Sequence, residues 1–166
     1  MTIGFYGGSV PYGNTRSLLY STGVQTARSA SGYVVSYTMP ASTLAIDSDY
    51  IVIDWMVVTT LAGSAAYSTS LIFDGTVISV VSSVTTGDVT RHRALVIRTG
   101  TNTITRGSDA SQDPGTGGDT TDNVGQTPGI PTDLSLPILI GGFINPAGAS
   151  DGIFTNSYFN VTLYTA

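Results

Sequence analysis

Glu and Lys are both absent from this sequence of 166 residues, in which all 11 acidic residues are Asp and all 6 basic residues are Arg. Glu and Lys are among the residues that best support helices on protein surfaces. Hydrophobic residues make up 41% of the chain, an ordinary share for a globular protein. A disordered chain combines low hydrophobicity with high charge, so we expect this chain to fold. Because Glu and Lys are absent, we expect little or no helix.

The charge balance excludes several classes of partner. The net charge is -5 and the chain has no Lys, so nucleic acid and anionic membrane surfaces are poor partners. No apolar run approaches the roughly 20 residues that span a bilayer, and no signal peptide is visible at the N-terminus. Without Cys there is no disulfide and no thiolate metal site.

From residue 16 onward, stretches rich in Val, Ile, Tyr and Thr alternate with clusters of Gly, Ser, Asn and Asp. This pattern is typical of short strands joined by turns. It predicts an all-β domain over 16–166, an antiparallel two-sheet β-sandwich of jelly-roll type. The expected strands lie near 16–21, 32–39, 49–60, 67–73, 76–82, 90–98, 101–105, 134–144 and 154–165.

The strand expected at 49–60 is apolar on both faces. Ile51, Ile53, Trp55 and Val57 alternate with residues of the opposite face. One face can fill the space between two sheets, and the other then needs a long loop or another subunit to cover it. We favour a subunit, because β-rich chains of low charge commonly assemble. The predicted oligomer interface consists of Tyr50, Val52, Met56 and Val58.

Two further segments have a clear strand signature. Asp74 and Gly75 separate two apolar strands and predict a tight hairpin, because both residue types tolerate positive φ. The last strand, 154–165, places Phe159, Val161 and Leu163 on one face. We expect this strand to pair with one that is distant in sequence.

Two segments lack strand periodicity. Residues 1–15 are rich in Gly and read as an extended N-terminal arm, which contains Phe5, Tyr6 and Tyr12 and could be held by a neighbour. Residues 107–133 contain three prolines and many glycines and predict a long Gly/Asp/Thr-rich loop that projects from one end of the sandwich.

No catalytic, cofactor-binding or metal-binding residues can be assigned. Carboxylates at 109, 113, 119 and 122 could ligate calcium, but their spacing fits a solvated loop better. His92 is the sole histidine and lacks a recognisable nucleophile elbow, so we interpret it as an ordinary strand residue and expect no enzyme. A single His without Cys cannot form a zinc site.

Other polar and aromatic residues leave alternatives open. Arg91 and Arg93 share one strand face and Arg98 occupies the other. They could meet an acidic partner surface, pair with local Asp residues or protect an edge strand. Asp54 interrupts an apolar strand and is expected to accept a hydrogen bond from Arg or Tyr. Several tyrosines could stack on sugars, anchor an interface or simply belong to a sheet: Tyr6, Tyr12, Tyr20, Tyr33 and Tyr37.

Residues 38–166 resemble small jelly-roll virion proteins of tailed bacteriophages. The resemblance rests on the order of four segments and on a turn between Asn145 and Asp151. It implies a noncatalytic jelly roll that trimerises and decorates a capsid or forms part of a tail, neck or fibre. The chain departs from the pattern in its insertion after Arg106 and in having no Lys on its strands. The segments are TMPASTLAIDSDYIVIDWMVVTT, YSTSLIFDGTVISVV, RHRALVIRTGTNTIT and DLSLPILIGGFINPAGASDGIFTNSYFNVTLYT.

The leading hypothesis is therefore a capsid decoration or cement protein located in the virion, which assembles as a homotrimer. It binds the major capsid protein or another virion protein, and Phe5, Tyr6 and Tyr12 of the N-terminal arm are the candidates for contacts with the capsid. The alternative is a receptor-binding head of a tail fibre or spike, in which residues 107–133 and surface tyrosines bind a host glycan.

Overall fold

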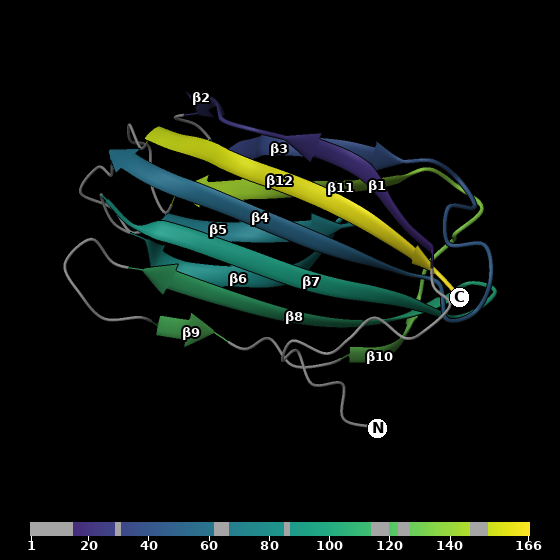
Figure 1. Cartoon of the computed structure of the whole chain (residues 1–166). Helices are drawn as coiled ribbons and strands as arrows, with labels where there is room; N and C mark the ends of the chain where they lie inside the picture. The colour runs from purple at the N-terminus through teal and green to yellow at the C-terminus, as the bar shows by residue number, and fades with distance from the viewer. Residues whose placement is uncertain are drawn as a thin grey trace.

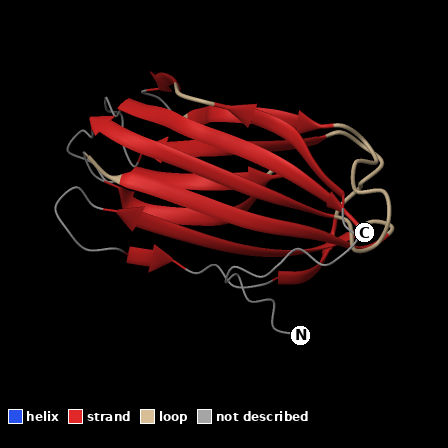
Figure 2. Cartoon of the chain, in the orientation of Figure 1, coloured by secondary structure: helices blue, strands red, loops and turns tan. Residues whose placement is uncertain are grey.

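The computed structural model describes residues 15–28, 31–61, 67–84, 87–113, 120–122, 127–146 and 153–166. In these ranges the chain is all-β, as the composition predicts, and two layers of strands lie face to face (Figure 2). The described residues include no helix of the length and apolarity that crossing a membrane requires.

Twelve strands form in the described part of the chain. Their bounds are β1 Thr15–Thr22, β2 Gln25–Arg28, β3 Gly32–Met39, β4 Tyr50–Leu61, β5 Tyr67–Phe73, β6 Thr76–Val84, β7 Val89–Gly100, β8 Thr103–Asp113, β9 Thr120–Asp122, β10 Thr127–Pro131, β11 Ile138–Pro146 and β12 Ile153–Thr165.

The strands form two antiparallel sheets. The eight-stranded sheet has the order β1-β12-β4-β7-β8-β10, with β2 added to β12 and β9 added to β8. The four-stranded sheet has the order β3-β11-β5-β6. In Figure 1 the larger sheet lies in front of the smaller one. The fold is a β-sandwich, as predicted.

The pairing of the strands is nested in the way that defines a jelly roll. The first strand pairs with the last, β1 with β12, and β3 pairs with β11. Inside these pairs, β4 pairs with β7 and β5 pairs with β6. The chain therefore behaves as one long hairpin folded over on itself, into which β8, β9 and β10 are inserted between β7 and β11.

The core lies between the two sheets. Ile51, Ile53, Trp55 and Val57 on β4 are fully buried, which confirms the predicted inward face. A Cβ added to Gly142 would come within 2.3 Å of the Trp55 ring, so Trp55 lies directly against the backbone of β11. Glycine at this position lets the two sheets approach closely around the largest side chain of the core.

The hairpin and the closing strand also form as predicted. Asp74 and Gly75 both have positive φ, 49° and 71°, as a two-residue hairpin turn requires. β12 pairs with β1 and with β4, which are distant in sequence, and its Phe159 and Val161 are fully buried.

The loop predicted at 107–133 is wrong over 107–113, 120–122 and 127–131, which form strands, whereas 114–119 and 123–126 lie outside the described residues. β8 continues to Asp113 and pairs with β7 throughout, and β9 and β10 both pair with β8. Pro128 and Pro131 are tolerated in β10 because it is an edge strand, where a missing N–H leaves one side of the ladder unaffected. β2 was not predicted, and the strand predicted at 101–105 ends too early.

Candidate functional site

The four-stranded sheet is built entirely from uncharged residues. β3, β5, β6 and β11 contain no Asp, Glu, Lys, Arg or His. Charged residues come close to this sheet at its margin, where Asp74 occupies the hairpin turn and Arg106 donates to the Val77 carbonyl oxygen at 3.2 Å. The outer face of this sheet therefore suits a neutral partner, since a charged ligand would find no opposite charge among its strands.

An aromatic pair lies on this outer face. Gly142 faces Trp55 in the core, so the neighbouring Gly141 faces outward, and a Cβ added there would come within 2.6 Å of the Tyr33 ring. The Tyr33 ring thus lies over the backbone of β11 at Gly141. Phe143 packs edge-on against Tyr33 with ring centroids 5.3 Å apart and an interplanar angle of 85°. These contacts hold the Tyr33 ring in one orientation.

Hydroxyl and amide groups surround the aromatic pair. Register places Ser36 beside Gly141 and Ser70 beside Phe143. We call the outer surface of the four-stranded sheet around Tyr33 the neutral face. It offers an apolar ring together with hydrogen-bonding groups that carry no charge. Its outward polar residues that are at least partly exposed are Ser36, Thr38, Ser68, Ser82 and Asn145, whereas Ser70 shares this side of the sheet but is 7% exposed.

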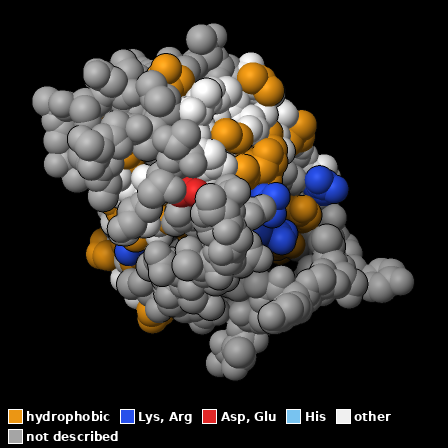
Figure 3. Space-filling view, turned by 90° about the vertical axis from the view of Figure 1, so that its left-hand side faces the viewer, with side chains coloured by type: hydrophobic (Ala, Val, Ile, Leu, Met, Phe, Trp, Pro, Cys, Tyr) orange, Lys and Arg blue, Asp and Glu red, His pale blue; other side chains and the backbone are white. Residues whose placement is uncertain are grey.

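The outer surface of the eight-stranded sheet is different in character, and we call it the mixed face. The predicted oligomer interface lies here: Tyr50, Val52, Met56 and Val58 are half-buried and alternate with the core residues of β4. Tyr50 stacks on Tyr164 of β12 with ring centroids 4.7 Å apart. Figure 3, an end-on view, shows arginine side chains beside hydrophobic ones at the surface.

The charged residues of the mixed face form an ion pair. Arg93 Nε lies 3.4 Å from Asp54 Oδ1, and the two side chains are 54% and 36% exposed. This contact supports the expectation that Asp54 pairs with an Arg, although Asp54 is less buried than the sequence suggests. Burial raises the pKa of Asp54, and the charge of Arg93 offsets that rise in part. The idea that the arginines protect an edge strand is wrong, because β7 lies between β4 and β8.

His92 is buried between the sheets. Its Nε2 lies 3.0 Å from Thr69 Oγ1 and its Nδ1 lies 2.8 Å from Ser79 Oγ. The ring stacks on Trp55, whose Nε1 donates to Asn156 Oδ1 at 3.0 Å. Burial lowers the pKa of His92 to about 3. The neutral imidazole thus links β7 to β5 and β6 of the opposite sheet, which agrees with the structural role expected from the sequence.

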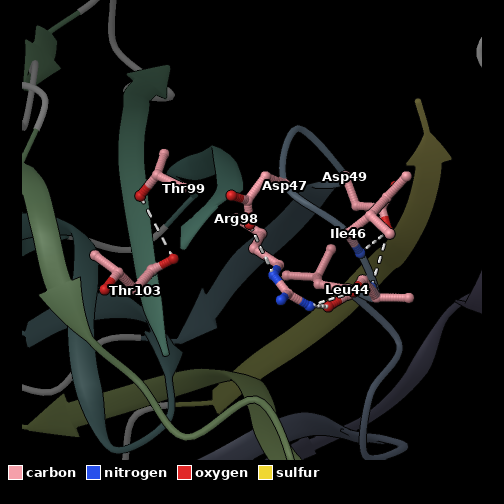
Figure 4. A network of polar contacts seen from close by, with 8 residues as sticks. Leu44, Ile46, Asp47, Asp49, Arg98, Thr99 and Thr103 are labelled. Carbon is pink, nitrogen blue, oxygen red and sulfur yellow. Dashed lines mark hydrogen bonds and ion pairs between the residues drawn. The ribbon is translucent and has the colours of Figure 1, made fainter. Parts of the chain in front are cut away.

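Arg98, on β7, binds the 40–49 loop at one end of the eight-stranded sheet (Figure 4). Its guanidinium binds Asp47 at 3.1 Å and the carbonyl oxygens of Leu44 and Ala45. Arg98 thus pairs with a local Asp, one of the alternatives that the sequence left open. The pair holds the loop across the sheet end.

Asp49, in the same loop, is 1% exposed. Its Oδ2 accepts from the N–H groups of Ala45 and Ile46 at 2.8 and 3.0 Å, and its Oδ1 accepts from the N–H of Ala166 at 3.1 Å. One carboxylate therefore joins the loop to the end of β12.

The remaining candidate residues divide into two groups. Tyr20 and Tyr37 stack on each other at 5.0 Å and pack against the core, so these tyrosines do not present a free ring as the glycan alternative assumed. The predicted arm residues Phe5, Tyr6 and Tyr12 lie outside the described residues, as does Asp119. Asp109, Asp113 and Asp122 lie on strands, but their side chains are likewise outside the description.

Sequence reasoning named Tyr33 but missed the neutral face around it. The available signal was the absence of charge from four whole strands combined with two adjacent glycines in β11. Only the strand order shows that those four strands form one sheet.

Comparisons with known proteins add little. No family model matches the sequence, and no curated protein does either. A solved structure of the CBM2 module of the evolved Dit protein of Lactobacillus casei BL23 phage J-1 is similar over 92% of this chain and 98% of that chain, with 9% sequence identity and a TM-score of 0.41. Likeness at this level assigns no function.

Proposed function

We propose that this chain is a noncatalytic module of a bacteriophage particle that binds a neutral carbohydrate on the host cell through the neutral face. The proposal is carried by one observation: Tyr33 lies over Gly141 on a sheet whose strands contain no charged residue. The C–H faces of a sugar ring can pack on an aromatic ring, and sugar hydroxyl groups can exchange hydrogen bonds with Ser, Thr and Asn. This reading keeps the receptor-binding alternative and moves its site away from residues 107–133.

The phage context of the proposal rests on the sequence resemblance of residues 38–166. Nested strand pairing agrees with the jelly roll which that resemblance implies.

Replacing Tyr33 with Ala is expected to weaken binding to neutral glycans by about tenfold, because one stacking contact of about 1.4 kcal/mol is lost. A glycan array followed by titration of the best neutral ligand measures the effect. Tyr50→Ala on the mixed face is the matched control and should leave the affinity unchanged. Since the ligand is neutral, binding should vary little with salt. Binding that survives Tyr33→Ala, or that requires a charged glycan, would refute the proposal.

A capsid decoration protein that forms a homotrimer on the major capsid protein is the second candidate. It is favoured by the half-buried apolar residues of the mixed face, including Tyr50 and Val52, and by Leu18, which is 61% exposed. Co-sedimentation with capsid shells together with a trimeric mass would support this candidate. Glycan binding at Tyr33 without capsid binding would exclude it.

A further inference from the structure

The mixed face has a regular side-chain pattern across its two central strands. β4 and β7 run antiparallel in register without a bulge, so each outward residue of β4 has a direct neighbour on β7. Three of these rows are wholly apolar, one joins Met56 to Arg91, and the middle one joins Asp54 to Arg93. The rows are Tyr50–Ile97, Val52–Leu95, Asp54–Arg93, Met56–Arg91 and Val58–Val89.

We propose that a second copy of this chain packs against the mixed face and is related to the first by a two-fold axis. This axis lies in the plane between the two copies, parallel to the strands and over the line along which β4 and β7 pair. Such an axis places each row over the same row of the other copy and exchanges β4 with β7. Asp54 then lies opposite Arg93 of the second copy, and Val52 lies opposite its Leu95. Every apolar row meets an apolar row, and the Asp–Arg ion pairs become a cluster of four alternating charges.

The flanking strands fit the same axis. β12 lies beside β4 and β8 lies beside β7, so the axis places β12 over β8 of the second copy. Register then sets Tyr164 over Thr105 and Tyr158 over Ser111, with Thr162 over Gly107. In the rows of Tyr164 and Tyr158 a large side chain therefore meets a small residue, which favours interdigitation of the two sheets, and the middle row sets Asn160 over Asp109.

Other arrangements of the same face are less favourable. A two-fold axis perpendicular to the strands through the middle row would place Asp54 over Asp54 and Arg93 over Arg93, which is repulsive. A ring of three copies needs two different complementary surfaces, whereas this face complements itself. Four adjacent strands of 11 to 13 residues present an area of the order of the 800 Å² that each partner buries in a specific interface.

The pairing can be tested by exchanging the two charges. The double variant Asp54→Arg with Arg93→Asp keeps an ion pair within each chain, so we expect it to fold and to form a dimer with itself. With the wild-type chain it would place Asp on Asp and Arg on Arg. In native mass spectrometry of a mixture with one isotope-labelled partner, mixed dimers should therefore be about tenfold rarer than random exchange gives.

The single variants provide a second arm that does not depend on the double variant. Asp54→Arg and Arg93→Asp should each raise the dimer dissociation constant about tenfold, and an equimolar mixture of the two should restore tight pairing. Thr76→Arg, at the hairpin of the other sheet, is the control and should leave the dimer unchanged.

A wild-type monomer at micromolar concentration, a trimer, random mixing with the double variant, or a mixture of single variants that pairs no better than either alone would overturn the inference. It is independent of the proposed carbohydrate site, because none of these readouts involves the neutral face.

Discussion

Lowering the pH from 6.5 to 4.5 is expected to reduce the free energy of unfolding by about 2.3 kcal/mol through His92 alone, with a slope that approaches about 1.4 kcal/mol per pH unit at the lower end. Burial lowers the pKa of His92 to about 3 in the folded protein, whereas the unfolded chain titrates near 6.5. Between these values the unfolded state binds a proton that the folded state does not. The stability due to the neutral ring is thus complete above pH 6.5 and falls as the pH falls toward 3.

Urea unfolding at a series of pH values measures this slope, and the range above pH 4.5 largely separates His92 from the Asp residues. His92→Gln is the control, since an amide can still hydrogen-bond to Thr69 and Ser79 and does not titrate. The variant should be less stable at pH 7 and should lack the slope. A wild-type protein whose stability is constant over this range, or a variant with the same slope, would show that the ring is not held neutral in the core.

Replacing Asp49 with Ala is expected to cost about 3 kcal/mol of unfolding free energy. The carboxylate accepts from three backbone N–H groups and is buried, so its removal leaves those donors without their partner. Asp47→Ala is the matched control in the same loop, because that side chain is 63% exposed and makes an ion pair with Arg98. We expect the control to cost less than about 1 kcal/mol.

Chemical denaturation of both variants gives the comparison directly. Asp49→Asn should fall between wild type and Asp49→Ala, since it keeps one acceptor oxygen. Equal losses for Asp49→Ala and Asp47→Ala would mean that the hydrogen bonds of Asp49 do not hold the loop to β12.

Local patterns were sufficient to predict the strands that form the core. Alternation along 49–60 identifies the buried face of β4, and the Asp74–Gly75 dipeptide identifies the hairpin between β5 and β6, because both signals depend only on neighbouring residues. The closing strand was predicted for the same reason. These elements belong to the nested pairs on which the sandwich depends.

The errors arise where distant pairing decides the structure. Residues 107–113 lack apolar alternation, yet they form a strand because β7 supplies a complete ladder beside them. The prolines of β10 suggest a loop until its position at the sheet edge is known. Tyr20 and Tyr33 look equivalent in the sequence, but one packs inward on Phe159 and the other lies outside on Gly141.

The two outer faces of the sandwich differ because the charges are distributed unequally between the sheets. Arg91, Arg93 and Asp54 belong to the eight-stranded sheet, and the four-stranded sheet has no charged residue. Charge pairs give register and specificity to contacts between proteins, whereas a neutral aromatic surface suits an uncharged ligand. This difference supports separate roles for the two faces, self-association on one and carbohydrate binding on the other.

Binding of a neutral carbohydrate over Tyr33 can be located by following the backbone amide resonances of the isotope-labelled chain during titration with a neutral oligosaccharide selected on the array. We expect the largest shifts at Ser36, Ser70 and Gly141, around the aromatic pair. Shifts concentrated instead at Val52 and Leu95 on the mixed face, or no shift with any neutral oligosaccharide, would contradict this binding site.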